Sequence, residues 1–491
     1  MGKFPVIHLS DLRQIPGALL MYGRSKPSLR RVSTDSRRCG PGDLFVALKG
    51  DRFDGHDFLK EVAARGVEGV VVSTTGFERH RSALRDSFAV IVPDTLAALG
   101  ELARLHRRRF SIPIVAVAGS NGKTGTKDLL AHLLAASMRV LKTEGNLNNH
   151  IGVPLTLLRL TPRHEAAVIE VGTNHFGEVE ALCRIVEPTH GLVTSIGREH
   201  LEFFGDLDGV ARAEFELYDH LATTGASAFA WWDDPYIRRY FTKFKASFPG
   251  PKLKPYRLEG WQANAPSSRQ KQGAPRPMVA ARRIGFGSGL RSILELKRPG
   301  RSNLKTTLGS PGRAGELASV AAVAVADELG VPSRLLPKRL ADFKPASSKR
   351  MEIRTRRGVT FINDAYNSNP DSLLLGLRTV SEYPCRGTKH LVLADMLELG
   401  AAGASEHEQA GRWVRKLGFT NLWTFGPLCQ HLYRGAGRLT FSRHFAEKKE
   451  LAQTLGRALR KGDLVYLKGS RSMALETVLD DLATRPEKRR S

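Results

Sequence analysis

The feature that most constrains this chain is the stretch IVAVAGSNGKTGTK at residues 114–127. Its first five residues are apolar and rich in β-branched side chains, which predicts a buried strand. Gly119 and Gly122 follow this strand, and an Ala/Leu-rich helical pattern comes after Lys127. Because consecutive backbone N–H groups at a helix N-terminus form a concave anion site, the order strand, glycine loop, helix predicts phosphate binding.

The side chains of this loop suit a nucleotide. Lys123 can reach the β- and γ-phosphates, and Thr124 can offer its hydroxyl to Mg²⁺. The two glycines are closer together than in the usual G-x-x-x-x-G-K-[ST] loop, so we expect a nucleotide site of a particular subclass. A glycine-rich turn with a chance lysine is the less favoured interpretation.

Length and charge narrow the class of protein. With 491 residues, the chain is expected to form two to four domains. Its 75 basic and 49 acidic residues give a net charge of +26, which favours an anionic partner such as nucleic acid or a polyphosphorylated substrate. The basic residues are spread along the chain without a nucleic-acid-binding motif. We therefore interpret the charge mainly as solvated surface.

The cellular location is predicted from two absent signals. No apolar run approaches the roughly 18 residues that span a bilayer, and the first residues lack the apolar core of a signal peptide. We therefore expect a cytoplasmic protein. Its four cysteines form no C-x-x-C pair, so they are expected to be reduced and partly buried rather than bridged or metal-bound.

Residues 1–108 are predicted to form a small α/β domain. Polar clusters on its loops are positions where a small ligand can be held. Asp35 and Arg37 belong to such a cluster, although a purely structural ion pair explains their spacing equally well. The helical pattern at 96–108 leads through Pro113 into the phosphate loop, and we place the first domain boundary there.

Residues 109–345 alternate strands and helices, as in a parallel sheet that is covered on both faces. Glu170 lies near the end of a predicted strand, and His200 follows another at 191–196. Ligands of such sheets bind beyond the carboxyl ends of the strands. Both residues are therefore candidate Mg²⁺ ligands, although Mg²⁺ prefers oxygen and each residue could instead be structural.

Two further segments of this region differ in composition. Residues 249–283 are rich in Pro, Gln, Ser and basic residues without a clean period, and we predict an irregular, exposed excursion there. Residues 315–329 are small and apolar, which predicts a tightly packed helix that ends at Gly330.

Residues 346–491 restart the alternation of strands and helices. The predicted strands at 358–364, 390–395 and 463–468 each end in a cluster of polar residues. Because the carboxyl ends of parallel strands meet at one edge of a sheet, these three clusters predict one shared binding edge.

With these motifs in this order, the chain resembles the Mur ligases over nearly its whole length. The phosphate loop is common to those enzymes, whereas GNLNNHIGVPLTLL, YNSNP and DM-x-ELG are specific to one member. The motifs that carry the resemblance are DSR at 35–37, PGDLFVAL at 41–48, DGH at 54–56, GSNGKTGTK at 119–127, GNLNNHIGVPLTLL at 145–158, EVGTNHFGE at 170–178, HLEFFG at 200–205, NDAYNSNPDS at 363–372, ADMLELG at 394–400 and KGSRSM at 468–473.

The resemblance implies an α/β protein of three domains: a UDP-sugar-binding domain at 1–108, a central P-loop ATPase domain at 109–345 and a C-terminal Rossmann-like domain at 346–491. It implies a ligase that uses ATP and Mg²⁺ to phosphorylate the free carboxylate of UDP-N-acetylmuramoyl-tripeptide and joins it to the amine of D-alanyl-D-alanine. We expect a monomer that makes peptidoglycan precursors, binds no nucleic acid and does not insert into a membrane. A family member that adds another amino acid, or a basic P-loop nucleic-acid-binding protein, is the alternative.

Matching positions then assign roles to individual residues. The implied catalytic residues are Lys123, His200, Glu214 and Arg350, and the implied metal ligands are Thr124, Glu170 and His200. The implied ATP-binding residues are Gly119, Ser120, Asn121, Gly122, Lys123, Thr124, Gly125, Asp364 and Asn367. The implied substrate-binding residues are Asp35, Ser36, Arg37, Asn148, Asn149, Tyr366, Asn369, Lys468, Ser470 and Arg471.

Three positions depart from the family pattern. Glu214 stands where most members have a lysine that becomes carbamylated and orders a second Mg²⁺. We hypothesise that Glu214 supplies a permanent carboxylate in place of that carbamate. Two tryptophans precede Asp233 where the family usually has asparagine, and Ala314 and Gly315 replace a histidine and an asparagine ahead of the Ala-rich helix.

Overall fold

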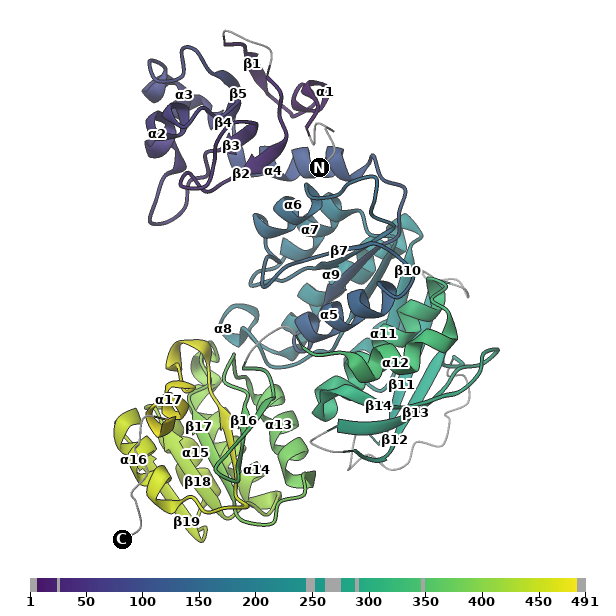
Figure 1. Cartoon of the computed structure of the whole chain (residues 1–491), viewed down its shortest axis with the longest axis vertical. Helices are drawn as coiled ribbons and strands as arrows, with labels where there is room; N and C mark the ends of the chain where they lie inside the picture. The colour runs from purple at the N-terminus through teal and green to yellow at the C-terminus, as the bar shows by residue number, and fades with distance from the viewer. Residues whose placement is uncertain are drawn as a thin grey trace.

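The computed structural model describes residues 7–23, 27–243, 252–260, 275–287, 291–345 and 349–483. Three sheets follow one another along the long axis of the molecule (Figure 1). We refer to the bodies around them as the N-terminal, central and C-terminal domains. The predicted α/β class with three sheet-containing domains is confirmed.

The N-terminal sheet has five strands in the order β1-β5-β4-β3-β2, and β1 is antiparallel to the rest. Its last helix, α4, packs on helices α6 and α7 of the central domain, so the two domains share one continuous core. The strands are β1 (Leu19–Met21), β2 (Arg31–Ser33), β3 (Asp43–Val46), β4 (Gly69–Ser73) and β5 (Phe88–Val92). The helices are α1 (Leu9–Leu12), α2 (Leu59–Ala64), α3 (Thr74–His80) and α4 (Thr95–Arg107).

The central sheet has nine strands in the order β14-β13-β12-β11-β10-β9-β6-β8-β7. All neighbours from β12 to β7 are parallel, whereas β13 and β14 add an antiparallel edge. Every residue of β6 is buried, as its unbroken apolar run predicts. The strands are β6 (Ile114–Ala118), β7 (Val140–Lys142), β8 (Ala166–Glu170), β9 (His190–Val193), β10 (Ser227–Trp231), β11 (Leu253–Glu259), β12 (Val279–Phe286), β13 (Arg291–Lys297) and β14 (Leu304–Pro311).

The prediction of an irregular excursion at 249–283 is wrong for part of that segment. Strand β11 pairs in parallel with β10, and β12 pairs in parallel with β11. In both strands apolar side chains such as Tyr256, Leu258, Val279 and Ala281 are buried, while their basic neighbours are less buried. Pairing with a formed sheet outweighed the Pro- and Arg-rich composition. Residues 261–274 lie outside the described residues.

Helices cover the central sheet. The predicted small-residue helix is confirmed as α11, which is buried along nearly its whole length and contacts α5. Gly330 follows it with a φ of 80°, a left-handed conformation that suits glycine at a helix end. The helices are α5 (Lys123–Leu134), α6 (Gly152–Leu157), α7 (Glu178–Val186), α8 (Leu201–Phe204), α9 (Leu207–Thr224), α10 (Pro235–Lys243), α11 (Gly312–Glu328) and α12 (Leu336–Asp342).

The C-terminal sheet has six strands in the order β15-β16-β20-β17-β18-β19, of which β15 is antiparallel. Strands β16, β20 and β17 are parallel neighbours, so the predicted shared edge at their carboxyl ends is confirmed. The strands are β15 (Glu352–Arg356), β16 (Val359–Asn363), β17 (Lys389–Ala394), β18 (Asn421–Phe425), β19 (Phe441–Phe445) and β20 (Leu464–Lys468). The helices are α13 (Pro370–Glu382), α14 (Gly403–Lys416), α15 (Cys429–Ala436), α16 (Lys448–Ala458) and α17 (Thr477–Ala483).

The central and C-terminal domains are joined by apolar packing as well as by polar contacts. Leu201 and Phe204 of α8 belong to the same buried cluster as Met396 and Leu399 of the C-terminal domain. No described helix is both long and apolar enough to cross a membrane. All four cysteines are free thiols, and three are buried, as predicted.

Candidate active site

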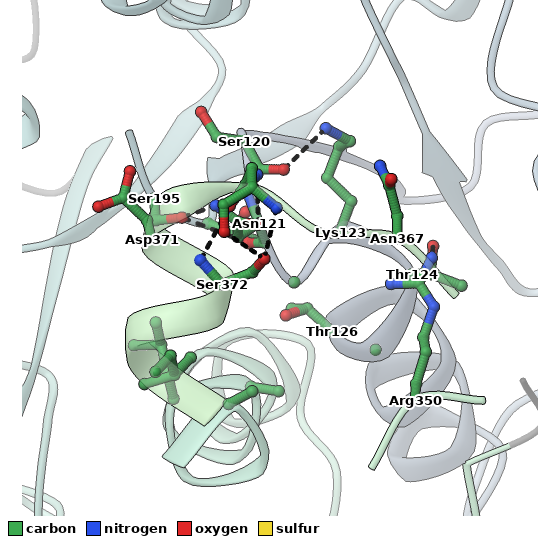
Figure 2. A pocket seen from close by; sticks show the side chains of 18 of the residues that line it. Ser120, Asn121, Lys123, Thr124, Thr126, Ser195, Arg350, Asn367, Asp371 and Ser372 are labelled. Carbon is green, nitrogen blue, oxygen red and sulfur yellow. Dashed lines mark hydrogen bonds between the residues drawn. The ribbon is translucent and has the colours of Figure 1, made fainter. Parts of the chain in front are cut away.

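A cavity of about 980 Å³ lies between the carboxyl-end edges of the central and C-terminal sheets. Segments that follow β6, β8, β9 and β10 form its central-domain wall, together with the start of α11. The segment after β16, the helix α13 and Lys468 form the opposite wall. Figure 2 shows the phosphate loop of one domain facing Arg350, Asp371 and Ser372 of the other.

The phosphate loop has the backbone that its glycines predict. Gly119 and Gly122 have φ values of 115° and 88°, in the left-handed region that disfavours other residues. A Cβ on Gly119 would lie 2.4 Å from the hydroxyl oxygen of Thr194. Because α5 begins directly after Gly122, the positive end of its dipole points at the cavity. The loop is therefore an anion site.

Lys123 follows the last glycine of this loop, and its side chain lies close to two acids, Glu199 and Glu214. Its ammonium donates to the carbonyl oxygens of Gly119 and Ser120 and lies 3.3 Å from Glu199 and 3.9 Å from Glu214. Burial raises the pKa of Glu199 to about 8, although Lys123 opposes the shift, and burial also raises the pKa of Glu214. Two buried carboxyls thus share one ammonium.

Glu214 also contacts the phosphate loop directly. Its Oε2 accepts a hydrogen bond of 2.6 Å from the backbone N–H of Gly119, and its side chain is 1% exposed. The carboxylate therefore lies beside the first glycine of the loop. The Glu214 carboxylate is therefore close to the loop on which we expect the phosphates of a nucleotide to bind.

Glu170 has the surroundings of a cation ligand. Its Oε1 accepts hydrogen bonds from Thr124 (3.2 Å) and Asn148 (3.0 Å). Its Oε2 is buried, lies 3.5 Å from the ammonium of Lys127 and has no hydrogen-bond partner among the described residues. A buried carboxylate oxygen in that state is suited to a metal ion.

His200 lines the same cavity but faces the other domain. Its Nδ1 lies 2.9 Å from Glu398 of the C-terminal domain. Burial lowers the pKa of His200, with Glu398 opposing the shift. Both residues have a positive φ, 51° and 63°, which is rare outside glycine. The contact therefore holds two strained backbones against each other across the domain boundary.

The C-terminal wall supplies one acid, Asp364, together with Arg350, Tyr366 and Lys468. Asp364 accepts hydrogen bonds from Lys468 (2.8 Å), from the hydroxyl of Tyr466 (3.0 Å) and from the backbone N–H of Met351. The Arg350 guanidinium is 4.1 Å from the centre of the Tyr366 ring and 3.5 Å from the Thr124 hydroxyl.

Three further predicted residues, Asn149, Asn367 and Asn369, also line the cavity. Their hydrogen bonds are made to other parts of the protein. The side chain of Asn369 caps α13 and donates to Asn121 of the phosphate loop at 3.0 Å. The carbonyl of Asn367 accepts from Lys468. The side-chain oxygen of Asn149 accepts hydrogen bonds from the backbone N–H groups of Ile151 and Gly152, just before and at the start of α6.

Seven predicted residues do not line this cavity: Asp35, Ser36, Arg37, Gly119, Glu214, Ser470 and Arg471. Gly119 and Glu214 contact each other at the base of the phosphate loop. Asp35 and Arg37 pair with each other at 2.9 Å, which lowers the pKa of Asp35 to about 2. Their loop belongs to the N-terminal domain, at the far end of the molecule in Figure 1. Ser470 bonds to backbone groups of Ser368 and Leu397, and Arg471 is exposed and pairs with Glu476.

Sequence reasoning missed Glu199, which lines the cavity, and Arg198, which joins the two domains. Glu199 lies between Arg198 and His200, and its closeness to Lys123 depends on the turn after β9. Arg198 forms ion pairs with Asp371 and Glu406 of the C-terminal domain. The one available signal was the charged run at 198–200 directly after a predicted strand.

Three family models match successive parts of the chain. The Mur ligase family catalytic domain matches residues 28–107, the Mur ligase middle domain matches 117–255, and the Mur ligase glutamate ligase domain matches 349–471. With a phosphate-loop domain and a facing C-terminal domain around one cavity, the chain belongs to the Mur ligase family.

Its similarity to particular members extends over the full length. It is 31% identical over 491 residues to the UDP-N-acetylmuramoyl-tripeptide--D-alanyl-D-alanine ligase of Bacillus subtilis, covering 99% of this chain and 100% of the relative. It is 32% identical over 454 residues to the enzyme of that name from Escherichia coli, covering 92% and 93%. The crystal structure of MurF from Acinetobacter baumannii superposes with a TM-score of 0.83 at 28% identity, over 98% of this chain and 99% of that one. MurF from Thermotoga maritima in complex with ADP has a TM-score of 0.77 at 26% identity, over 93% and 98%.

Proposed function

We propose that this chain is an ATP-dependent amide ligase that joins D-alanyl-D-alanine to the tripeptide of UDP-N-acetylmuramoyl-tripeptide, in cytoplasmic peptidoglycan precursor synthesis. The observation that carries the proposal is a cavity in which an anion-binding loop faces Arg350 and Lys468 of another domain. The names of the full-length relatives give the substrates. We further propose that the chain acts as a monomer with the domain limits 1–108, 109–345 and 346–491.

The chemistry joins two anions, so positive groups must offset their repulsion. In the first step, a carboxylate oxygen of the tripeptide attacks the γ-phosphorus of ATP, the bond from that phosphorus to the bridging oxygen breaks, and ADP leaves. The N–H groups of the loop, the α5 dipole and Lys123 stabilise the charge on the transferring phosphoryl group. Lys123 exchanges its bonds to the loop carbonyls for bonds to phosphate, and Arg350 approaches from the C-terminal side.

In the second step, the free amine of D-alanyl-D-alanine attacks the acyl phosphate, and inorganic phosphate leaves as the amide forms. The acyl phosphate reacts with water unless water is excluded. The cavity is walled by two domains, and their closure serves this purpose.

The donor set fits Mg²⁺. We propose that Thr124, Glu170 and His200 hold it, because Glu170 has a buried carboxylate oxygen without a hydrogen-bond donor and lies beside the Thr124 hydroxyl. When bound, Mg²⁺ neutralises phosphate charge. We propose that Glu214 serves as the fixed carboxylate at the position of the family's carbamylated lysine, supported by its contact with the Gly119 N–H.

The remaining roles are proposals based on position. Asp364 and Asn367 bind the ribose of ATP, and both line the cavity. Asp35, Ser36 and Arg37 bind the UDP-sugar from the N-terminal domain, and Asn148 and Asn149 bind it from the central domain. The tripeptide and the dipeptide are bound by Tyr366, Asn369, Lys468, Ser470 and Arg471.

The test is release of ADP from the purified chain supplied with ATP, Mg²⁺ and UDP-N-acetylmuramoyl-tripeptide, with and without D-alanyl-D-alanine. The proposal requires rapid ADP release that depends on both UDP-N-acetylmuramoyl-tripeptide and D-alanyl-D-alanine. Release that depends on another amino acid, but not on D-alanyl-D-alanine, would assign a different ligase activity. Salt-sensitive binding of DNA in place of the UDP-sugar would favour the nucleic-acid alternative.

A further inference from the structure

The proposed chemistry leaves the segment ADMLELG at 394–400 without a role. This segment begins at the end of β17 and is fixed to its own domain. The backbone N–H of Met396 donates to Nε2 of His407 at 3.0 Å, and that of Leu397 donates to the hydroxyl of Ser470 at 2.9 Å. The Met396 side chain is fully buried. The backbone of the segment is therefore held in a defined position.

The same segment rests on the central domain. Its apolar side chains share a buried cluster with Leu201 and Phe204 of α8. The carbonyl of Glu398 accepts a hydrogen bond of 3.5 Å from the backbone N–H of Glu202. A Cβ added to Gly400 would lie only 3.3 Å from the Cα of Glu202. The two backbones therefore approach closely where the domains meet.

At this contact the Glu398 carboxylate meets the His200 ring. Oε2 of Glu398 lies 2.9 Å from Nδ1 of His200, which makes no hydrogen bond of regular geometry to any described residue. The Glu398 side chain is 55% exposed, so its backbone, with a φ of 63°, and not packing directs it across the boundary. A carboxylate at this distance favours the ring tautomer with the proton on Nδ1, which leaves Nε2 as an acceptor.

We propose that Glu398 is a positioning residue for His200: its carboxylate fixes the orientation and the tautomer of the ring from the opposite domain. The inference rests on the proposed function, in which His200 is one of the proposed Mg²⁺ ligands. Because the two residues belong to different domains, the ring is held only while the C-terminal domain is docked on the central domain. The pair thereby links docking to completion of the catalytic site.

The ring nitrogens of His200 report on this pair without any ligand. We would record nitrogen–proton correlation spectra of the full-length chain with isotope-labelled histidine, free of nucleotide and metal, and identify the His200 signals with His200→Gln. The wild type should carry the proton on Nδ1. In Glu398→Gln both tautomers should appear, because the amide can accept from Nδ1 or donate to it. Glu398→Asp keeps the charge and tolerates the positive φ, so it should fall between the two.

The kinetic counterpart is a loss of kcat without a loss of binding. We expect kcat of Glu398→Gln to fall about 10–100-fold, the usual effect of removing a group that orients a ligating histidine. KM for ATP and for the tripeptide substrate should stay near the wild-type values, because Glu398 does not line the cavity. The radius of gyration should also be unchanged, since Arg198 and Asp371 still join the domains. Glu408→Gln, which removes an exposed acid of the same domain, is the control.

The outcomes separate this inference from the proposed function. A wild-type tautomer in Glu398→Gln would overturn the inference, and so would a wild-type kcat in a variant whose tautomer has changed. An increased radius of gyration in Glu398→Gln would assign Glu398 to docking instead of positioning. Each of these results leaves the proposed function in place, because the wild-type chain still forms the amide. A wild-type chain that forms no amide would overturn both.

Discussion

Arg198 of the central domain and Asp371 of the C-terminal domain form a two-point ion pair, with Nη2 2.7 Å from Oδ1 and Nε 3.2 Å from Oδ2. Asp371 also accepts the backbone N–H of Arg198, and Glu406 lies 3.0 Å from the same guanidinium. Because the Arg198 side chain is 21% exposed, solvent screens this contact only in part. The pair fixes the C-terminal domain beside the phosphate loop.

Replacing Arg198 with alanine should slow catalysis by loosening this arrangement. We expect kcat/KM to fall about tenfold, equivalent to about 1.4 kcal/mol, and the radius of gyration in X-ray scattering to increase. Asp371→Asn should have a smaller effect in the same direction. Arg354→Ala, which removes an exposed pair with Glu352, serves as the control. Unchanged scattering and activity in Arg198→Ala would show that the pair does not hold the domains together.

Gly119 should not tolerate a side chain. A Cβ there would lie 2.4 Å from Thr194 Oγ1, and the φ of 115° is unfavourable for alanine. We expect Gly119→Ala to abolish nucleotide binding and to cost about 1–3 kcal/mol of folding free energy, measured by calorimetry and by urea unfolding. Gly403→Ala meets only ordinary contacts of 3.7 Å and should behave like the wild type. Normal ADP affinity in Gly119→Ala would contradict the proposed loop.

Catalysis should require the Glu214 side chain as a charged carboxylate. We expect Glu214→Gln to lose about 100-fold in kcat, an effect of the size seen when one electrostatic contact to a reacting centre is removed. Glu214→Lys should recover activity when bicarbonate is added, because a carbamate restores the carboxylate. The wild type should be indifferent to bicarbonate. Full activity in Glu214→Ala would exclude the hypothesis.

Asp54 should make the stability of the N-terminal domain depend on pH. Burial opposes its ionisation, but hydrogen bonds from His56 and Arg79 lower its pKa to about 2. A folded pKa below the unfolded value of 3.8 gives stabilisation that is complete above about pH 4 and is lost as the pH falls through 2. Asp54→Asn should therefore cost roughly 1 kcal/mol at pH 7 and clearly less at pH 2. An equal cost at both pH values in denaturant unfolding would contradict this assignment.

Local patterns predicted the parts of the molecule that depend on neighbouring residues. The run at 114–118 and the glycines after it were enough to predict β6, the loop and α5. Strands β11 and β12 were missed because pairing with β10 stabilises them despite a composition typical of loops.

Contacts between domains could not be predicted in the same way. Residues 198 and 371 are far apart in the sequence, and neither carries a local signal of the other. The motif residues of the phosphate loop and Glu170 meet at one cavity as predicted, whereas Asp35 and Arg37 lie far from it.

Mass spectrometry of the complete reaction tests the central claim most directly. With ATP, Mg²⁺, UDP-N-acetylmuramoyl-tripeptide and D-alanyl-D-alanine, we predict one UDP-N-acetylmuramoyl-pentapeptide for each ADP, and no product from Lys123→Ala. Pentapeptide formation at the wild-type rate by Lys123→Ala, or ADP formation without any amide product, would contradict the account.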